Sequence, residues 1–111
     1  MAATLTQYGE VTVLNLKDDL VGQEVESFTH RASQAISSRQ VQMVIDMSHC
    51  KGIDSAGLEA LLDLQGKCET EFGTAKLCGL DDTCKRILEI TRINRRFETF
   101  DTLEAAVKSF A

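Results

Sequence analysis

A serine stands between an aspartate and a small-residue pair in the segment CKGIDSAGLEALL, residues 50–62. An apolar run precedes this segment and a helical spacing of apolar residues follows, so Asp54, Ser55, Ala56 and Gly57 occupy a strand-to-helix junction. Free N–H groups and the helix dipole favour an anion at such a place. A phosphate on Ser55 would add about −1.5 to −2 charge while the fold persists. Ser55 is therefore a candidate phosphoacceptor on a docking surface.

The same residues also have a purely structural interpretation. Aspartate and serine are preferred helix N-caps, so the spacing alone leaves a capping role for Ser55 open. Gly57 would then simply permit close packing. A catalytic serine has less support, because the GxSxG pattern is missing and no histidine is placed to act as its base. No GxxxxGK[ST] phosphate loop is present, so we expect that the protein is not an enzyme, and weak nucleotide hydrolysis at the Asp54–Ser55 corner is the weaker alternative.

The composition is that of a small acidic domain. The chain has 111 residues, a net charge of −5 and 43% hydrophobic residues, enough for one core. Direct nucleic-acid binding would need a basic surface. No apolar run approaches the roughly 20 residues that span a bilayer, and no secretion signal is visible. We expect one domain over residues 1–111 that is cytoplasmic, not inserted in a membrane and monomeric in isolation.

Cysteine and histidine are the residue types that could hold a metal or carry redox chemistry here. No two cysteines form a CxxC pair, and the histidines complete no metal-ligand pattern. Without a secretion signal, free buried thiols are the expected state, and zinc or redox chemistry is the weaker alternative. We expect no metal and no cofactor. The residues concerned are Cys50, Cys68, Cys78, Cys84, His30 and His49.

Strand and helix patterns alternate along the first half of the chain. Two short strands surround a turn at residues 8–10, and a helical stripe follows, with Asp18 and Asp19 as its candidate N-caps. The run from Val41 to Met47 is apolar and rich in β-branched residues, which predicts a central strand buried on both faces.

The second half continues the alternation. A helical face runs over residues 58–72, and Gly73 is expected to end that helix. The segment AKLCGL is expected to form a strand, and Asp81 or Asp82 is expected to cap a short helix after it. FETF is expected to form a short strand, and residues 101–102 are expected to start a last helix. The order is β-β-α-β-α-β-α-β-α. It predicts an α/β fold with a mixed, mostly parallel sheet of about five strands and about four helices.

A basic cluster surrounds the third expected helix and the loop after it. It is either a solvated face that balances nearby acids or a docking patch for an acidic partner. The cluster consists of Lys85, Arg86, Arg92, Arg95 and Arg96.

The chain resembles the STAS domain, the fold of bacterial anti-sigma factor antagonists. The segment VIDMSHCKGIDSAGLEALL is similar to the family pattern of a hydrophobic strand, a short loop, Asp-Ser-Ser/Thr-Gly-Leu and a helix. The later CKRILEITRINRRFETFDTLEAAV resembles the family's third helix, short last strand and closing helix. The resemblance covers nearly the full length and implies a single STAS-like domain.

The resemblance implies a switched binding protein. Such proteins bind an anti-sigma factor that is also a serine kinase, and thereby free a sigma factor. The kinase phosphorylates the first serine of the motif, and a PP2C-type phosphatase restores it. By this match Ser55 is the phosphoacceptor, and Asp18 is an open alternative to Asp19 as the family's acidic residue after the second strand. The implied partner-binding residues are Asp19, Asp54, Ser55, Ala56, Gly57 and Leu58.

Two residues depart from the family pattern. Ala56 replaces the usual second Ser or Thr, and Arg92 stands where many members have glycine. Both departures bear on the identity of the partner. The resemblance also implies an alternative function, since some STAS domains are adaptor subunits of lipid-transport ABC ATPases. In that case the junction would dock an ATPase without being phosphorylated.

Overall fold

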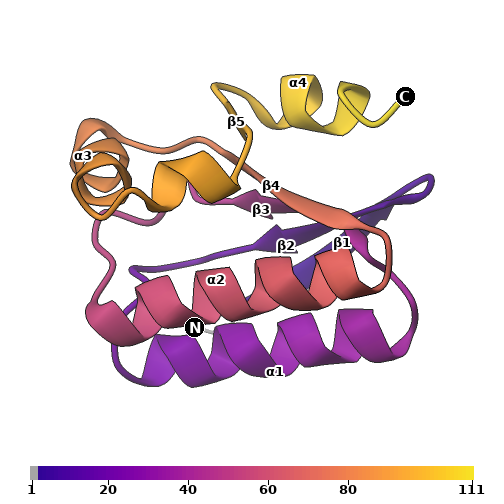
Figure 1. The fold of residues 1–111 in the computed structure, drawn as a ribbon, viewed down its shortest axis with the longest axis horizontal. Helices are drawn as coiled ribbons and strands as arrows, with labels where there is room; N and C mark the ends of the chain where they lie inside the picture. Colours follow the sequence, from indigo (N-terminus) through magenta and orange to yellow (C-terminus); the bar gives the residue numbers. More distant parts are fainter. Residues whose placement is uncertain (1–2) are drawn as a thin grey trace.

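Five strands form one sheet in the computed structural model, which describes residues 3–111 (Figure 1). The strands lie side by side in chain order: β1 Thr4–Tyr8, β2 Val11–Asn15, β3 Gln42–Asp46, β4 Thr74–Cys78 and β5 Thr99–Phe100. β1 pairs antiparallel with β2, and every other pair of neighbours is parallel. The helices are α1 Gln23–Ser37, α2 Ser55–Thr70, α3 Asp82–Ile90 and α4 Leu103–Lys108, with a short 3-10 helix, η1, at Ile93–Arg96. The predicted fold class and element order are confirmed.

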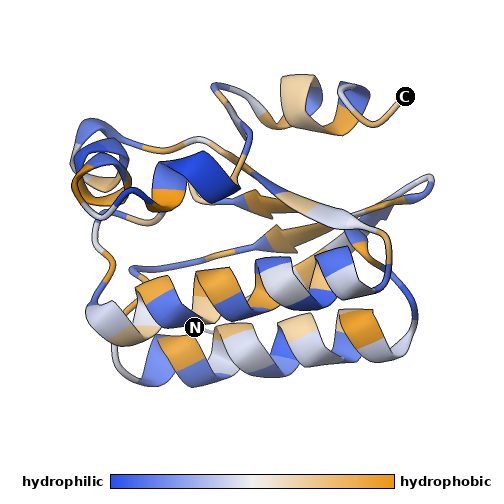
Figure 2. Cartoon of the chain, viewed as in Figure 1, coloured by the Kyte–Doolittle hydropathy of each residue, from blue (hydrophilic) through white to orange (hydrophobic). Residues whose placement is uncertain are grey.

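The helices cover the two faces of the sheet unequally. α1 and α2 lie side by side on one face, and α4 lies on the other (Figure 1). The larger core contains Leu14, Ile45 and Leu77 from the strands, together with Phe28 of α1 and Leu61 of α2. In Figure 2 the middle strands are largely hydrophobic, whereas η1 is strongly hydrophilic. β3 is buried on both faces, as its sequence predicts, because α4 covers the side that α1 and α2 leave open.

α1 begins later than the sequence predicts. Leu20 is still extended, because it forms a parallel bridge with Ile53. The helix then starts after Gly22, whose φ of 55° is left-handed and which provides no side-chain cap. The prediction that Asp18 or Asp19 caps α1 is therefore wrong, because the chain has not yet turned into the helix at those positions.

The end of α2 also differs from the prediction. The helix ends at Thr70, and Phe72 is 95% exposed instead of lying on the buried face. Gly73 does not supply the left-handed residue, since Phe72 does so with a φ of 66°. A side chain at Gly73 would overlap the carbonyl oxygen of Val41 and come within 2.6 Å of its Cβ. The glycine is thus used for close approach between the loops before β3 and β4.

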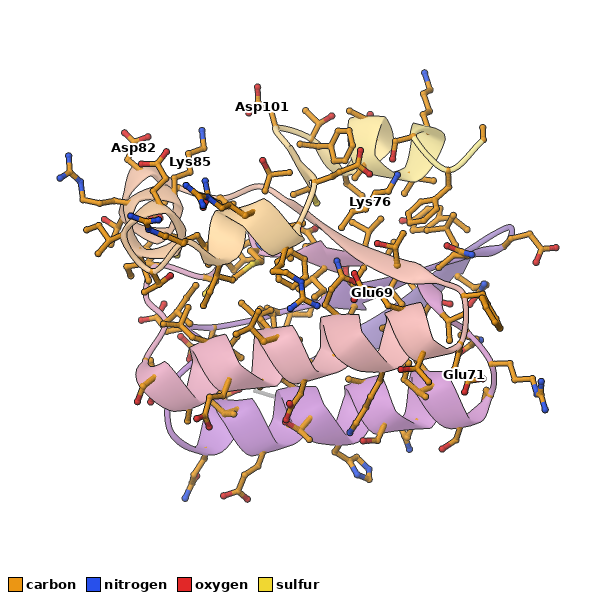
Figure 3. The ribbon with its side chains drawn as sticks, viewed as in Figure 1. Glu69, Glu71, Lys76, Asp82, Lys85 and Asp101 are labelled. Carbon is orange, nitrogen blue, oxygen red and sulfur yellow. The ribbon has the colours of Figure 1, made fainter. Side chains whose placement is uncertain are left out.

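Lys76 is a buried cation beneath α4 (Figure 3). Its ammonium nitrogen lies 2.8 Å from Ser109 Oγ and 3.2 Å from Glu98 Oε1. The same nitrogen lies 4.2 Å from the centre of the Phe110 ring, a cation–π contact. Lys76 therefore ties the C-terminal residues to the middle of β4.

Removing the whole Lys76 side chain should lower the stability of the fold more than removing only its charge. We expect Lys76→Ala to lower the free energy of unfolding by about 1–3 kcal/mol, because packing and the polar contacts are both lost. Lys76→Met keeps most of the packed volume, and Ser109 Oγ retains its bond to Ala106 O, so the loss should be clearly smaller. Urea unfolding of both variants checks this expectation. Equal losses would show that the charge, and not the packed stem, holds α4.

Candidate functional site

Two chain segments meet beyond the carboxyl ends of β2 and β3. The Leu20 N–H donates to Gly52 O at 2.9 Å, and the Asp54 N–H donates to Leu20 O at 3.2 Å. Together they form the parallel bridge between Leu20 and Ile53. This short pairing continues the β2–β3 contact past the strands and holds the start of α2 beside the start of α1.

Asp54 is the residue that joins the two helix starts. One carboxylate oxygen accepts from Gly57 N at 2.8 Å, which makes Asp54 the N-cap of α2. The other accepts from Gly22 N at 3.1 Å, immediately before α1. These bonds favour the charged form, so the pKa of Asp54 lies below its ordinary value, with the Gly57 N–H as the largest cause. The junction therefore carries a fixed negative charge at neutral pH.

Ser55 is the first residue of α2 and its side chain is exposed. Within residues 3–111 its hydroxyl makes no hydrogen bond, and the cap is Asp54, so the capping role considered for Ser55 is wrong. One part of the phosphate argument also changes. Because Asp54 already accepts from the Gly57 N–H, that donor of the helix start is not free for a phosphate on Ser55. Such a phosphate would add charge to the exposed surface next to an existing carboxylate.

Gly57 lies beneath this surface. A Cβ at Gly57 would overlap Leu20 O and come within 2.9 Å of Ile53 Cγ2. The glycine therefore permits the first turn of α2 to lie directly against the bridge between the two segments. Ala56 is exposed and Leu58 is half-buried on either side of it.

The two candidate aspartates near the end of β2 are placed differently. Asp19 reaches the loop before Ser55, because its Oδ1 accepts from Lys51 N at 2.7 Å. A Cβ on Gly52 would lie 3.7 Å from the other oxygen of this carboxylate. Asp18 is exposed and accepts only from the neighbouring Asp19 N–H among the described hydrogen bonds. The structure thus brings Asp19, and not Asp18, to the loop that precedes the junction.

We call the accessible residues of this region the junction surface. It consists of Asp19, Asp54, Ser55, Ala56 and Leu58. Sequence reasoning missed Leu20 and Gly22, which organise it through their backbone groups. The glycine alone gave a weak signal, since a glycine shortly before a helix indicates an unusual backbone angle.

The predicted basic cluster lies on α3 and η1. Arg96 pairs with Glu69 of α2 at 3.0 Å, so part of the cluster balances an acid, as one interpretation expects. The other four basic side chains are exposed, and none of them forms an ion pair within the described part of the chain. Arg92 has a φ of 63°, in the left-handed region that glycine adopts most easily. The loop keeps that backbone angle without a glycine.

All four cysteines are buried and free, as predicted. Burial raises the pKa of Cys68 to about 11 and that of Cys78 to about 12, and it also raises the pKa values of Cys50 and Cys84. In residues 3–111 no group of three or more His, Cys, Asp or Glu side chains could hold a metal ion. No described helix is both long and apolar enough to cross a membrane.

These thiols should be unreactive in the folded protein. At about pH 8 we expect negligible alkylation by iodoacetamide, because the thiolate is the reactive form and its population falls as the pKa rises. In denaturant all four should react, and intact mass spectrometry counts the added groups. Rapid alkylation of a cysteine in the native protein would contradict the buried environment described above.

Comparison of the sequence with models of protein families shows the family of this chain. The model of the STAS domain matches residues 2–106. The chain belongs to the STAS domain family. No curated protein matches this STAS domain in sequence.

Solved structures share the fold of this STAS domain over nearly its whole length. An anti-sigma-factor antagonist (STAS) domain protein from Planctomyces limnophilus has a TM-score of 0.87 at 21% identity and covers all of both chains. An anti-sigma factor antagonist from Mycobacterium paratuberculosis has a TM-score of 0.87 at 18% identity and covers 97% of this chain and 92% of its own. The Bacillus cell fate determinant SpoIIAA in its phosphorylated form has a TM-score of 0.77 at 20% identity, with 99% and 100% covered. At these identities the likeness shows a common fold.

Proposed function

We propose that this STAS domain is an anti-sigma factor antagonist. It binds an anti-sigma factor with serine kinase activity, releases a sigma factor, is switched off by phosphorylation of Ser55 and is restored by a PP2C-type phosphatase. The junction surface is the docking face. This function needs no catalytic residue and no cofactor in the STAS domain itself.

One observation carries the proposal. The Ser55 hydroxyl is exposed and forms no hydrogen bond in residues 3–111, while the neighbouring Asp54 caps α2. A phosphate can therefore be added without removing a contact that holds the fold. The change would fall on the surface, where a second charge beside the ionised Asp54 repels acidic groups and alters a fitted contact. The phosphorylated form of SpoIIAA, which has the same fold, supports such a modification.

The direct test is mass spectrometry of the protein from its native cells, with peptide mapping across residues 52–67. A fraction that carries one phosphate on Ser55 is the expected result. In vitro, an anti-sigma factor kinase from the same genome should transfer phosphate to the wild type and not to Ser55→Ala. No phosphate under any growth condition, together with co-purification of a transporter ATPase from native membranes, would overturn the proposal in favour of the adaptor function.

A further inference from the structure

Phe72 is the most exposed of the large hydrophobic side chains in the described chain. It is 95% exposed, whereas the other three exposed ones, Tyr8, Val21 and Ile90, reach 72% at most. It also adopts a left-handed φ of 66°, which is unfavourable for a bulky residue. A polar residue, asparagine above all, would suit this exposed left-handed position better in water. An exposed bulky ring held at this backbone angle is a candidate for contact with another molecule.

Gly66 is a second feature that packing within the chain does not explain. It lies in the interior of α2, where glycine is the least favourable residue except proline. A Cβ at Gly66 would meet nothing within 4 Å, in contrast to Gly57 and Gly73, where a Cβ would overlap the backbone. The missing side chain leaves space on the outer surface of the protein.

That space belongs to a groove between α1 and α2 with a volume of about 440 Å³. Ile36 and Leu62 form its apolar part together with Gly66. Its other lining residues are Asp63, Lys67, Thr70 and Glu71. Glu71 lines the groove at the end of α2, where Figure 3 places it, and Phe72 is the next residue along the chain.

We propose that a second copy of this chain seats its Phe72 in this groove beside Gly66, and receives the first copy's Phe72 in its own groove. A two-fold dimer needs a surface that is complementary to itself. A knob and a hole that follow each other directly along the chain meet that need, because each copy supplies one of each and a single rotation fills both grooves. Gly66 lets the ring approach the helix backbone closely.

The charges around the groove fit the same occupant. Asp63 and Glu71 are acidic and Lys67 is basic, and within the described residues none of the three forms an ion pair. A second copy brings both signs to the interface, so each lysine can approach an acid of the other chain. A partner with one dominant charge would leave part of the rim unsatisfied.

The dimer leaves the junction surface free. Ser55 begins α2, whereas the groove is lined by residues from its second half and Phe72 follows its end. The proposed contact is limited to one ring and one groove per copy, so we expect a weak dimer that depends on protein concentration. The inference goes beyond the proposed antagonist function and does not depend on it. It replaces the sequence-based expectation of a monomer with a concentration-dependent dimer.

Sedimentation equilibrium of the whole protein across micromolar to millimolar concentrations tests the proposal. We expect the wild type to dimerise reversibly. Phe72→Asn and Gly66→Leu should each weaken dimerisation at least about tenfold, because one removes the knob and the other fills the hole. Both variants should also unfold at the wild-type temperature or above it, since asparagine tolerates a left-handed φ and leucine favours a helix. Unfolding temperatures at or above that of the wild type would show that a loss of association does not come from misfolding.

The matched control is Ile90→Asn, which removes another exposed apolar side chain, 72% exposed, from α3. Its dimerisation should equal that of the wild type. A wild type that stays monomeric at millimolar concentration would overturn the proposal. So would a dimer that Phe72→Asn leaves unchanged, or one that Ile90→Asn weakens, because the interface would then lie elsewhere.

Discussion

Ser55→Asp should lower the affinity for an anti-sigma factor kinase at least about tenfold, equivalent to about 1.4 kcal/mol, and leave the fold intact. The substitution places a second carboxylate beside the ionised Asp54 on an exposed position of the junction surface. The folded protein loses no hydrogen bond of the serine hydroxyl, so the melting temperature should stay near that of the wild type. A phosphate carries more charge than aspartate and should weaken binding further. Isothermal titration calorimetry with the kinase from the same genome gives the affinities.

Two variants separate a local effect from a general effect of charge. Ser55→Ala should bind as the wild type does, because it adds no charge. Ser33→Asp adds the same charge to an exposed position of α1, away from the junction surface, and should also bind normally. If Ser55→Asp binds as tightly as the wild type, the junction surface is not the switched docking face.

Gly57→Ala should destabilise the protein by about 1–3 kcal/mol, although it adds only one methyl group. The new Cβ would overlap Leu20 O and lie within 2.9 Å of Ile53 Cγ2. The first turn of α2 would have to move away from the bridge between Leu20 and Ile53. That movement would also disturb the bond between Asp54 and Gly22. Urea unfolding measures the loss, and binding by the folded variant measures the damage to the junction surface.

The same substitution at another position of the same helix provides the control. Gly66→Ala should stabilise the protein by about 0.5–1 kcal/mol, because alanine favours the helix and its Cβ meets nothing within 4 Å. The two variants are thus expected to change the free energy of unfolding in opposite directions. A neutral Gly57→Ala, or a Gly66→Ala that is equally damaging, would contradict the close approach of α2 to the bridge.

The sequence predicted the order of elements because each has a strong local signal. β3 has an apolar centre, residues 43–45, which lies buried between two layers. The turn at Gly9 has the left-handed φ of 61° that glycine favours, and it closes the predicted hairpin. The strand-to-helix junction at Ser55 was located for the same reason, since an apolar run changes to helical spacing there. These features depend on residues close together in the chain.

The predictions that failed depend on contacts between distant segments. Asp18 and Asp19 are of a residue type that is typical of N-caps, but the pairing of Leu20 with Ile53 keeps the chain extended beyond them. Gly73 does help to end α2, because its N–H donates to Cys68 O at 2.7 Å, but the left-handed residue is Phe72, and the missing side chain of Gly73 serves the close approach to Val41. A local sequence pattern does not include the distant partners Ile53 and Val41. It therefore could not reveal the contacts that these partners impose on the aspartates and on Gly73.

The sequence by itself determined the alternation of strands and helices, the buried central strand and the position of the Asp-Ser-Ala-Gly junction, because hydrophobic periodicity and residue preferences act over a few neighbouring residues. Only the tertiary structure decided that Asp54 caps α2 and also bonds to Gly22, which leaves the Ser55 hydroxyl free. It also decided that Phe72 lies outside the core and that Gly66 lines an open groove between α1 and α2. The physical reason is that hydrogen bonds and close approaches between segments far apart in sequence depend on how the layers pack together.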